Sequence, residues 1–148
     1  MNSITKKFYL DIEISKGMKV LDVGCGKGAT TELIAEIVGE NGKVIGIDSN
    51  RNALYRAEQN INLNKLKNIN YICADLSNLD IENNKFDAIV GRRILKYLPD
   101  PKSSIKQLSK LLKPSGVMGF QEHDSTNLIN DEKMPLHSKV NNWIRKLV

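Results

Sequence analysis

Apolar and polar positions follow two different periods along this chain. Five short apolar runs, each bounded by glycine, aspartate or polar residues, are typical of buried strands in a parallel sheet. They span residues 18–23, 44–48, 69–73, 86–91 and 117–121. Between them, apolar residues recur every three or four positions, which predicts amphipathic helices. The predicted apolar helix faces are Leu33, Ile34, Ile37 and Val38; Leu54, Ala57 and Ile61; and Ile105, Leu108, Leu111 and Leu112.

The order of these elements predicts the fold class. Strands that alternate with helices form an α/β fold, here a Rossmann-like, doubly wound, mainly parallel sheet of about five strands with helices on both faces. Asp100 before Pro101 predicts the start of the third helix, and the KPSG sequence at 113–116 predicts a turn. A last apolar stripe predicts a helix over about 135–148. We expect one domain over residues 1–148 with its core at 18–124.

Composition excludes several classes of protein. The chain has 148 residues, of which 41% are hydrophobic and 26% charged, as in an ordinary globular domain. No run approaches the roughly 20 apolar residues of a membrane helix, so we expect no membrane association and a cytoplasmic location. Cys25 and Cys73 are too few for a disulfide framework and lack zinc-site spacing, so no metal is expected. The net charge is +5, but the lysines are spread along the chain, which favours a solvated basic surface over an anionic partner.

A glycine-rich segment, VLDVGCGKGATT at residues 20–31, directly follows the first predicted strand. Ligands of open parallel sheets bind at the carboxyl ends of the strands, where the strand order reverses. Gly24, Gly26 and Gly28 would let the backbone pass close to such a ligand and turn into a helix. The same letters also satisfy the dinucleotide fingerprint G-x-G-x-x-G/A. The glycines alone therefore indicate a ligand without specifying it.

Acidic residues lie at the ends of the first three predicted strands. The carboxylate of Asp22 would repel a pyrophosphate but suits a cationic ligand. Asp48 can accept both hydroxyls of a ribose, as an acid also does in nicotinamide-binding folds. Asp75 alone would be a common turn residue. Together, the three acids favour a site for a nucleoside-containing cation.

Residues 22–28, DVGCGKG, resemble motif I of the class I S-adenosylmethionine-dependent methyltransferases. That motif is an acidic residue followed by three glycines at alternating positions, and it is matched at each of these four positions. The resemblance covers residues 18–124 and implies S-adenosylmethionine as cofactor. It implies that Asp22 lies by the methionine part of the cofactor, and that Asp75 and the backbone of Leu76 contact the adenine. The implied cofactor-binding residues are Asp22, Gly24, Cys25, Gly26, Gly28, Asp48, Ser49, Asp75, Leu76 and Gly91.

The segment from residue 86 to 124 is similar to the second half of small-molecule methyltransferases, with Ser115 where the family has glycine. The similarity implies a small-molecule acceptor, with Arg92, Glu122 and His123 as candidate acceptor-binding residues. His123 is the candidate catalytic base, because its unperturbed pKa lies near neutrality. The alternatives are structural hydrogen bonds for His123 and simple solvation for Arg92. The chain has no Pro-Cys pair and no Asn-Pro-Pro-aromatic sequence, so nucleic acid is not the expected substrate.

Complete members of the family carry seven strands, and the usual strands six and seven are absent from the predicted elements. We therefore expect either a truncated chain or a sheet edge that is covered in another way, for example by a partner in a homo-oligomer. Three functions stay open at this point. The first is a methyltransferase that acts on a small molecule, and the second is a cofactor-binding fragment without turnover. The third, an NAD(P)-dependent oxidoreductase, is disfavoured by Asp22.

Overall fold

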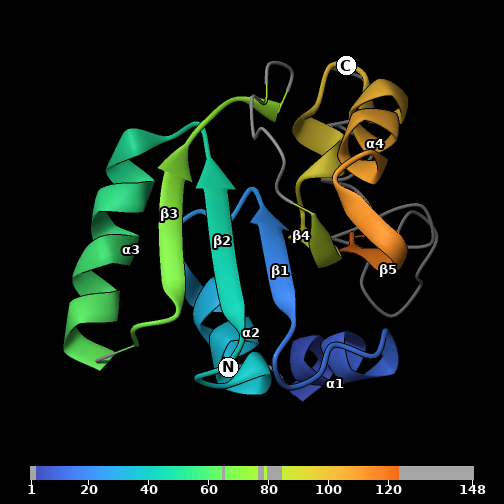
Figure 1. The fold of residues 1–148 in the computed structure, drawn as a ribbon. Helices are drawn as coiled ribbons and strands as arrows, with labels where there is room; N and C mark the ends of the chain where they lie inside the picture. The colour runs from blue at the N-terminus through green and yellow to red at the C-terminus, as the bar shows by residue number, and fades with distance from the viewer. Residues whose placement is uncertain (1–2, 65, 77–78, 80–84, 124–148) are drawn as a thin grey trace, which may run out of the picture.

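The computed structural model describes residues 3–64, 66–76, 79 and 85–123 (Figure 1). Strands and helices alternate along these residues, as the apolar pattern predicts. The elements are α1 (Ser3–Asp11), β1 (Lys19–Val23), α2 (Ala29–Val38), β2 (Lys43–Asp48), α3 (Arg51–Asn64), β3 (Ile69–Cys73), β4 (Phe86–Arg92), η2 (Leu95–Tyr97), α4 (Pro101–Ser109) and β5 (Leu112–Gln121). The predicted C-terminal helix at about 135–148 lies outside the described residues.

The strands form one parallel sheet in the order β3-β2-β1-β4-β5. The predicted Rossmann-like α/β fold is confirmed. Successive strands run outward from β1 to β3 on one side, and β4 and β5 then fill the other side. The order therefore reverses between β1 and β4, and ligands of open parallel sheets bind near such a point, at the carboxyl ends of the strands.

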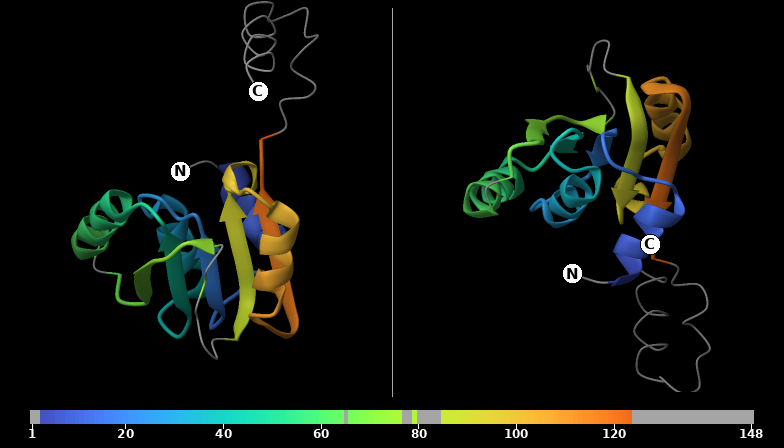
Figure 2. Two further views of the ribbon diagram at one scale, coloured as in Figure 1. Left: turned by 90° about the horizontal axis from the view of Figure 1, so that it is seen from above. Right: turned by 60° about the horizontal axis from the view of Figure 1, so that its bottom comes forward.

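Each face of the sheet carries its own hydrophobic core, because successive strand residues point to opposite faces. In β1, Val20 belongs to the core under α1 and α2, whereas Leu21 and Val23 belong to the core on the side of α4. The views in Figure 2 show α1 and α2 on one side of the sheet and α4 on the other. Phe86 and Leu108 are buried on the α4 side. The sheet is thus covered on both faces over its central strands.

The N-terminal helix α1 is not among the predicted elements. Tyr9 is fully buried, and Thr5 is buried as well and donates a hydrogen bond to Oε1 of Gln121 over 3.0 Å. Ile4 and Leu10, by contrast, are exposed. A polar residue on the buried face and apolar residues on the exposed face remove the clean stripe by which a helix is predicted. Helix α1 therefore packs on one face of the sheet, next to β5.

Two predicted boundaries near β5 are wrong, although the start of α4 is confirmed. Asp100 caps α4 by accepting a hydrogen bond from the Ser103 amide at 3.0 Å, with Pro101 in the first turn. Helix α4 nevertheless ends at Ser109, and Leu112 pairs with Phe86 as the start of β5. Leu112 continues the helical spacing of apolar residues, but it is a half-buried strand residue that packs against the core on the α4 side instead. The KPSG sequence lies inside β5 as an irregularity of the β4–β5 ladder.

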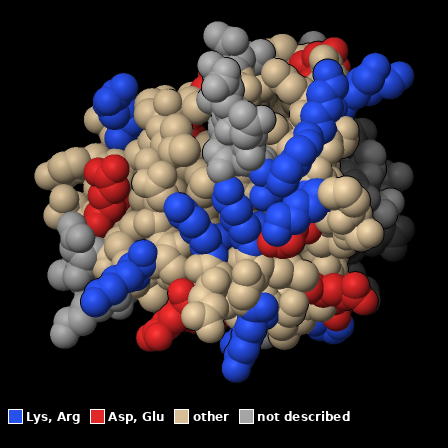
Figure 3. Space-filling view, viewed as in Figure 1, with Lys and Arg blue, Asp and Glu red and all other residues tan. Residues whose placement is uncertain are grey.

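Basic side chains gather in space although they are spread along the sequence. Lys19 and Lys43 begin β1 and β2, and Lys113 lies near the start of β5, where it forms an ion pair with Asp87 at 2.7 Å. Partial burial lowers the pKa of Lys19, and the charges of Lys43 and Lys113 lower it further. Figure 3 shows Lys and Arg side chains grouped in the middle of this view. Their positions in β1, β2 and β5 put these three lysines at the amino ends of the strands, away from the carboxyl ends.

Among the described residues, no helix is both long and apolar enough to cross a membrane.

Candidate functional site

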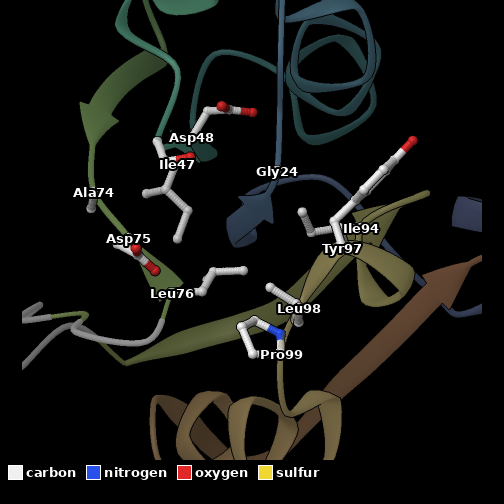
Figure 4. Close-up of a pocket in the computed structure, with 11 residues that line it drawn as sticks. Gly24, Ile47, Asp48, Ala74, Asp75, Leu76, Ile94, Tyr97, Leu98 and Pro99 are labelled. Carbon is white, nitrogen blue, oxygen red and sulfur yellow. The ribbon is translucent and has the colours of Figure 1, made fainter. Parts of the chain in front are cut away.

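A cavity of about 310 Å³ opens at the carboxyl ends of β1, β2 and β3. This volume lies at the lower end of the range for sites that hold small molecules. The lining residues come from the glycine loop, from the segments after β2 and β3, and from the segment around η2. They are Gly24, Ile47, Asp48, Ser49, Ala74, Asp75, Leu76, Ile94, Tyr97, Leu98 and Pro99 (Figure 4).

The glycine loop turns sharply between β1 and α2. The amides of Gly24 and Cys25 both donate to the carbonyl of Ile47, at 2.8 and 3.0 Å, which ties the loop to the end of β2. Gly24 and Gly26 have φ values of +69° and +57°, a region that favours glycine. A Cβ on Gly24 would lie 2.6 Å from Cδ1 of Ile94, whereas a Cβ on Gly26 would meet nothing within 4 Å. Gly24 is therefore required for conformation and for packing, and Gly26 for conformation.

This difference gives a test of the loop. We expect Gly24→Ala to lower the free energy of unfolding by about 1 to 2 kcal/mol more than Gly26→Ala, because only the first side chain collides with Ile94. Gly26→Ala should show the left-handed backbone cost alone, about 1 to 2 kcal/mol. Urea unfolding monitored by circular dichroism measures both values. Equal losses would show that Ile94 does not pack against Gly24 in solution.

Asp48 joins the glycine loop to the start of α3. Its Oδ2 accepts a hydrogen bond from the Gly26 amide at 2.8 Å, and its Oδ1 accepts one from the Asn50 amide at 2.8 Å. Asn50 in turn caps α3 by accepting from the amides of Asn52 and Ala53. A carboxylate has about four acceptor positions, so these two bonds leave capacity for the hydroxyls of a ligand. Asp48 also lines the cavity, and its contact with the cofactor stays a prediction.

Asp22 lies behind the loop and does not line the cavity. Its side chain is completely buried, and Oδ2 accepts hydrogen bonds from the hydroxyls of Thr30 at 3.0 Å and Thr31 at 2.7 Å. Oδ1 has no hydrogen-bond partner. Burial raises the pKa of Asp22 to about 6, against the lowering effect of the two threonine hydroxyls. In this structure Asp22 fixes the first turn of α2, and its predicted contact with the methionine part of the cofactor stays a prediction.

The remaining predicted site residues divide into those that line the cavity and those that do not. Ser49, Asp75 and Leu76 line the cavity with Asp48, as expected. Cys25 is buried behind the loop, where burial raises the pKa of its thiol, so the group is a protonated packing residue. Gly26, Gly28, Gly91, Arg92, Glu122 and His123 also lie outside the lining, and His123 is exposed just after β5.

One wall of the cavity was missed at the level of sequence. Ile94, Tyr97, Leu98 and Pro99 line it from the side of β4, opposite the segment after β3 (Figure 4). Their sequence shows only a short leucine- and proline-containing turn, without a charged or glycine pattern to mark it. The signal is their position after the fourth strand, next to the point where the strand order reverses.

Comparisons with known proteins agree with this geometry. A family described as "Methyltransferase domain" matches residues 14–147. The "Ubiquinone biosynthesis O-methyltransferase" of Coxiella burnetii is 35% identical over 114 residues, which are 76% of this chain and 47% of the relative. The "Demethylmenaquinone methyltransferase" of a Geobacillus species is 32% identical over 118 residues, which are 80% of this chain and 50% of the relative. The chain thus spans about half the length of these curated relatives.

Solved structures give the same fold. A crystal structure of a "SAM dependent methyltransferase from Aquifex aeolicus" superposes with a TM-score of 0.69 at 28% identity, covering 74% of this chain and 58% of that one. The "[4+2]-Cyclase SpnF" superposes with a TM-score of 0.73 at 25% identity, covering 80% of this chain and 43% of the cyclase. Because the family match runs over most of the sequence and the sheet order, glycine loop and cavity agree with it, this chain belongs to the class I S-adenosylmethionine-dependent methyltransferases.

Proposed function

We propose that this chain binds S-adenosylmethionine in the cavity beside Gly24 and acts as a methyltransferase on a small-molecule acceptor. The observation that carries the proposal is the meeting of Asp48, Asp75 and the glycine loop in one cavity. Their positions in the sequence are far apart, and the parallel sheet brings them together at the carboxyl ends of β1, β2 and β3.

The residues present fit the parts of the cofactor. Asp48 would accept the ribose hydroxyls, since the residue lines the cavity and its oxygens keep acceptor capacity beyond the Gly26 and Asn50 amides. Asp75 and Leu76 would contact the adenine, with the apolar side chain of Leu98 on the other wall. When bound, the cofactor supplies a methyl group that its sulfonium has already activated.

The protein's own contribution to the reaction is alignment and exclusion of water. Holding two reactants in line supplies up to about 7 to 11 kcal/mol of a barrier, so methyl transfer needs no catalytic dyad. For a hydroxyl acceptor or an acidic carbon, His123 is the proposed base, with Arg92 and Glu122 as proposed acceptor contacts. His123 and Glu122 are exposed just after β5 and Arg92 is half-buried at the end of β4. The names of the two curated relatives make hydroxylated aromatic and quinone-type rings the first acceptors to test.

A second candidate is a cofactor-binding domain without methyl transfer. The solved structure of the [4+2]-cyclase SpnF has this fold with a TM-score of 0.73, so the fold by itself does not determine the reaction. Binding and turnover must therefore be measured separately.

Calorimetric titration of the full chain tests the binding half of the proposal. We expect S-adenosylhomocysteine to bind with a one-to-one stoichiometry and NAD and NADP to give no heat of binding. The carboxylate of Asp22 behind the loop disfavours a pyrophosphate by charge repulsion. Heat from NAD without heat from S-adenosylhomocysteine would overturn the assignment and favour an oxidoreductase.

Turnover is tested with S-adenosylmethionine labelled on its methyl group and a panel of phenols, catechols and quinones. Transfer of label to an acceptor supports the methyltransferase, whereas binding without transfer to any acceptor favours the non-catalytic domain. Chromatographic mass with and without cofactor tests the proposed homo-oligomer. The cytoplasmic location stays a prediction.

A further inference from the structure

A carboxylate at the end of β5 holds the far wall of the cavity. Oε1 of Glu122 accepts hydrogen bonds from the backbone amides of Ile94 at 2.9 Å and Leu95 at 3.0 Å. Leu95 begins η2, so these amides belong to the unpaired first turn of a short helix. One carboxylate oxygen thus accepts from two backbone amides that have no acceptor within η2 itself.

The backbone between β4 and η2 is shaped to meet Glu122. The β4–β5 ladder pairs Arg92 with Gln121, and the Arg93 amide donates to the carbonyl of Gln121 at 2.9 Å. Arg93 then adopts a φ of +57°, which turns the chain out of the ladder immediately before Ile94. Glu122 follows Gln121 directly, so its side chain continues the connection at the point where the ladder stops.

The side chain of Ile94 packs against the glycine loop, so the position of its backbone also affects the loop. A Cβ on Gly24 would lie 2.6 Å from Cδ1 of Ile94, and a Cβ on Gly91 would lie 2.8 Å from its Cγ2. The side chain of Ile94 therefore fills the space that two glycines leave open, one in the loop and one at the end of β4. A shift of the Ile94 backbone would move the apolar wall and also release Gly24.

We propose that Glu122 is a positioning residue for the cofactor cavity. Its carboxylate fixes the backbone of Ile94 and Leu95, so that Ile94, Tyr97 and Leu98 stand as a preformed wall. This role is additional to the acceptor contact proposed above for Glu122, and its effect on cofactor affinity rests on the proposed function. A preformed wall raises affinity because no ordering of the loop is needed when the ligand binds.

Hydrogen exchange of the full chain without any ligand tests the wall itself. In Glu122→Ala, the Ile94 and Leu95 amides should exchange at least about 10-fold faster by NMR, because they lose their acceptor. Exchange of the Val20 and Leu21 amides in β1 should stay unchanged, which shows that the fold is intact. Glu122→Gln keeps an acceptor oxygen and should restore most of the protection. Unchanged exchange of Ile94 and Leu95 in Glu122→Ala overturns the proposal.

Calorimetry with S-adenosylhomocysteine tests the consequence. Glu122→Ala should raise Kd by about 10-fold, equal to about 1.4 kcal/mol, and Glu122→Gln by no more than about threefold. Glu36→Ala, which removes an exposed carboxylate from α2, is the matched control and should leave Kd unchanged. Faster exchange with an unchanged Kd overturns the proposal. If the unmodified chain does not bind S-adenosylhomocysteine, the proposed function fails instead, and hydrogen exchange alone decides whether Glu122 holds the wall.

Discussion

Asp48→Ala is expected to weaken the binding of S-adenosylhomocysteine by at least about 100-fold. Hydrogen bonds to a charged group contribute roughly 1.5 to 3 kcal/mol each, and the proposed site gives the ribose two of them. The variant also releases the Gly26 amide, which Asp48 accepts at 2.8 Å, and so loosens the loop that lies against the ligand. Calorimetric titration of the two proteins under the same buffer conditions measures the change.

Asp48→Asn is the matched variant for this experiment. It keeps one acceptor oxygen but adds an amide donor that faces the Gly26 or Asn50 amide. We therefore expect its affinity for S-adenosylhomocysteine to lie between those of the unmodified chain and Asp48→Ala. Urea unfolding of both variants separates loss of the ligand contact from loss of fold. Because the Asp48 side chain is only partly buried, we expect both variants to stay folded. An affinity of Asp48→Ala within about threefold of the unmodified chain would contradict the assignment of the ribose to Asp48.

The parts of the fold that were predicted correctly are those with a repeated pattern. Buried parallel strands are continuous apolar runs, so β1, β2 and β4 were located within one residue at each end. Helix α1 was missed because Thr5 is buried and Ile4 is exposed, which reverses the usual sides. The end of α4 was misplaced because Leu112 satisfies the helical spacing while it pairs with Phe86 in the sheet. Tertiary packing decided both cases.

Within the site, sequence positions identified which residues meet and not what each side chain does. Asp48 and Asp75 were expected at neighbouring strand ends, and both line the cavity. Asp22 pairs with Gly46, two residues before Asp48, so it lies deeper in the sheet, and its carboxylate accepts from Thr30 and Thr31 in the first turn of α2. The wall from Ile94 to Pro99 and its bond to Glu122 depend on a contact over 28 positions, which no local pattern records.

The buried carboxylate of Asp22 leads to the second large effect, on stability. Burial raises its pKa from 3.8 to about 6 in the folded protein. The folded state therefore binds this proton more tightly than the unfolded state. As pH rises from about 4 to about 6, ionisation of Asp22 lowers the free energy of unfolding, and the penalty is complete above pH 6. Two pKa units correspond to about 3 kcal/mol.

Asp22→Asn removes this ionisation while its carboxamide oxygen still accepts from Thr30 and Thr31. The free energy of unfolding of the variant minus that of the unmodified chain should therefore increase by about 3 kcal/mol between pH 4 and pH 7. Urea unfolding at intervals across this range measures the difference, and Glu36→Gln, which removes an exposed charge from α2, should show no such rise. A difference that stays constant with pH would mean that the pKa of Asp22 is the same in the folded and the unfolded chain, as for a well-solvated carboxylate. In that case its carboxylate would not be the buried anchor of α2, and a direct role at the ligand would become the better explanation for an acid before the glycines.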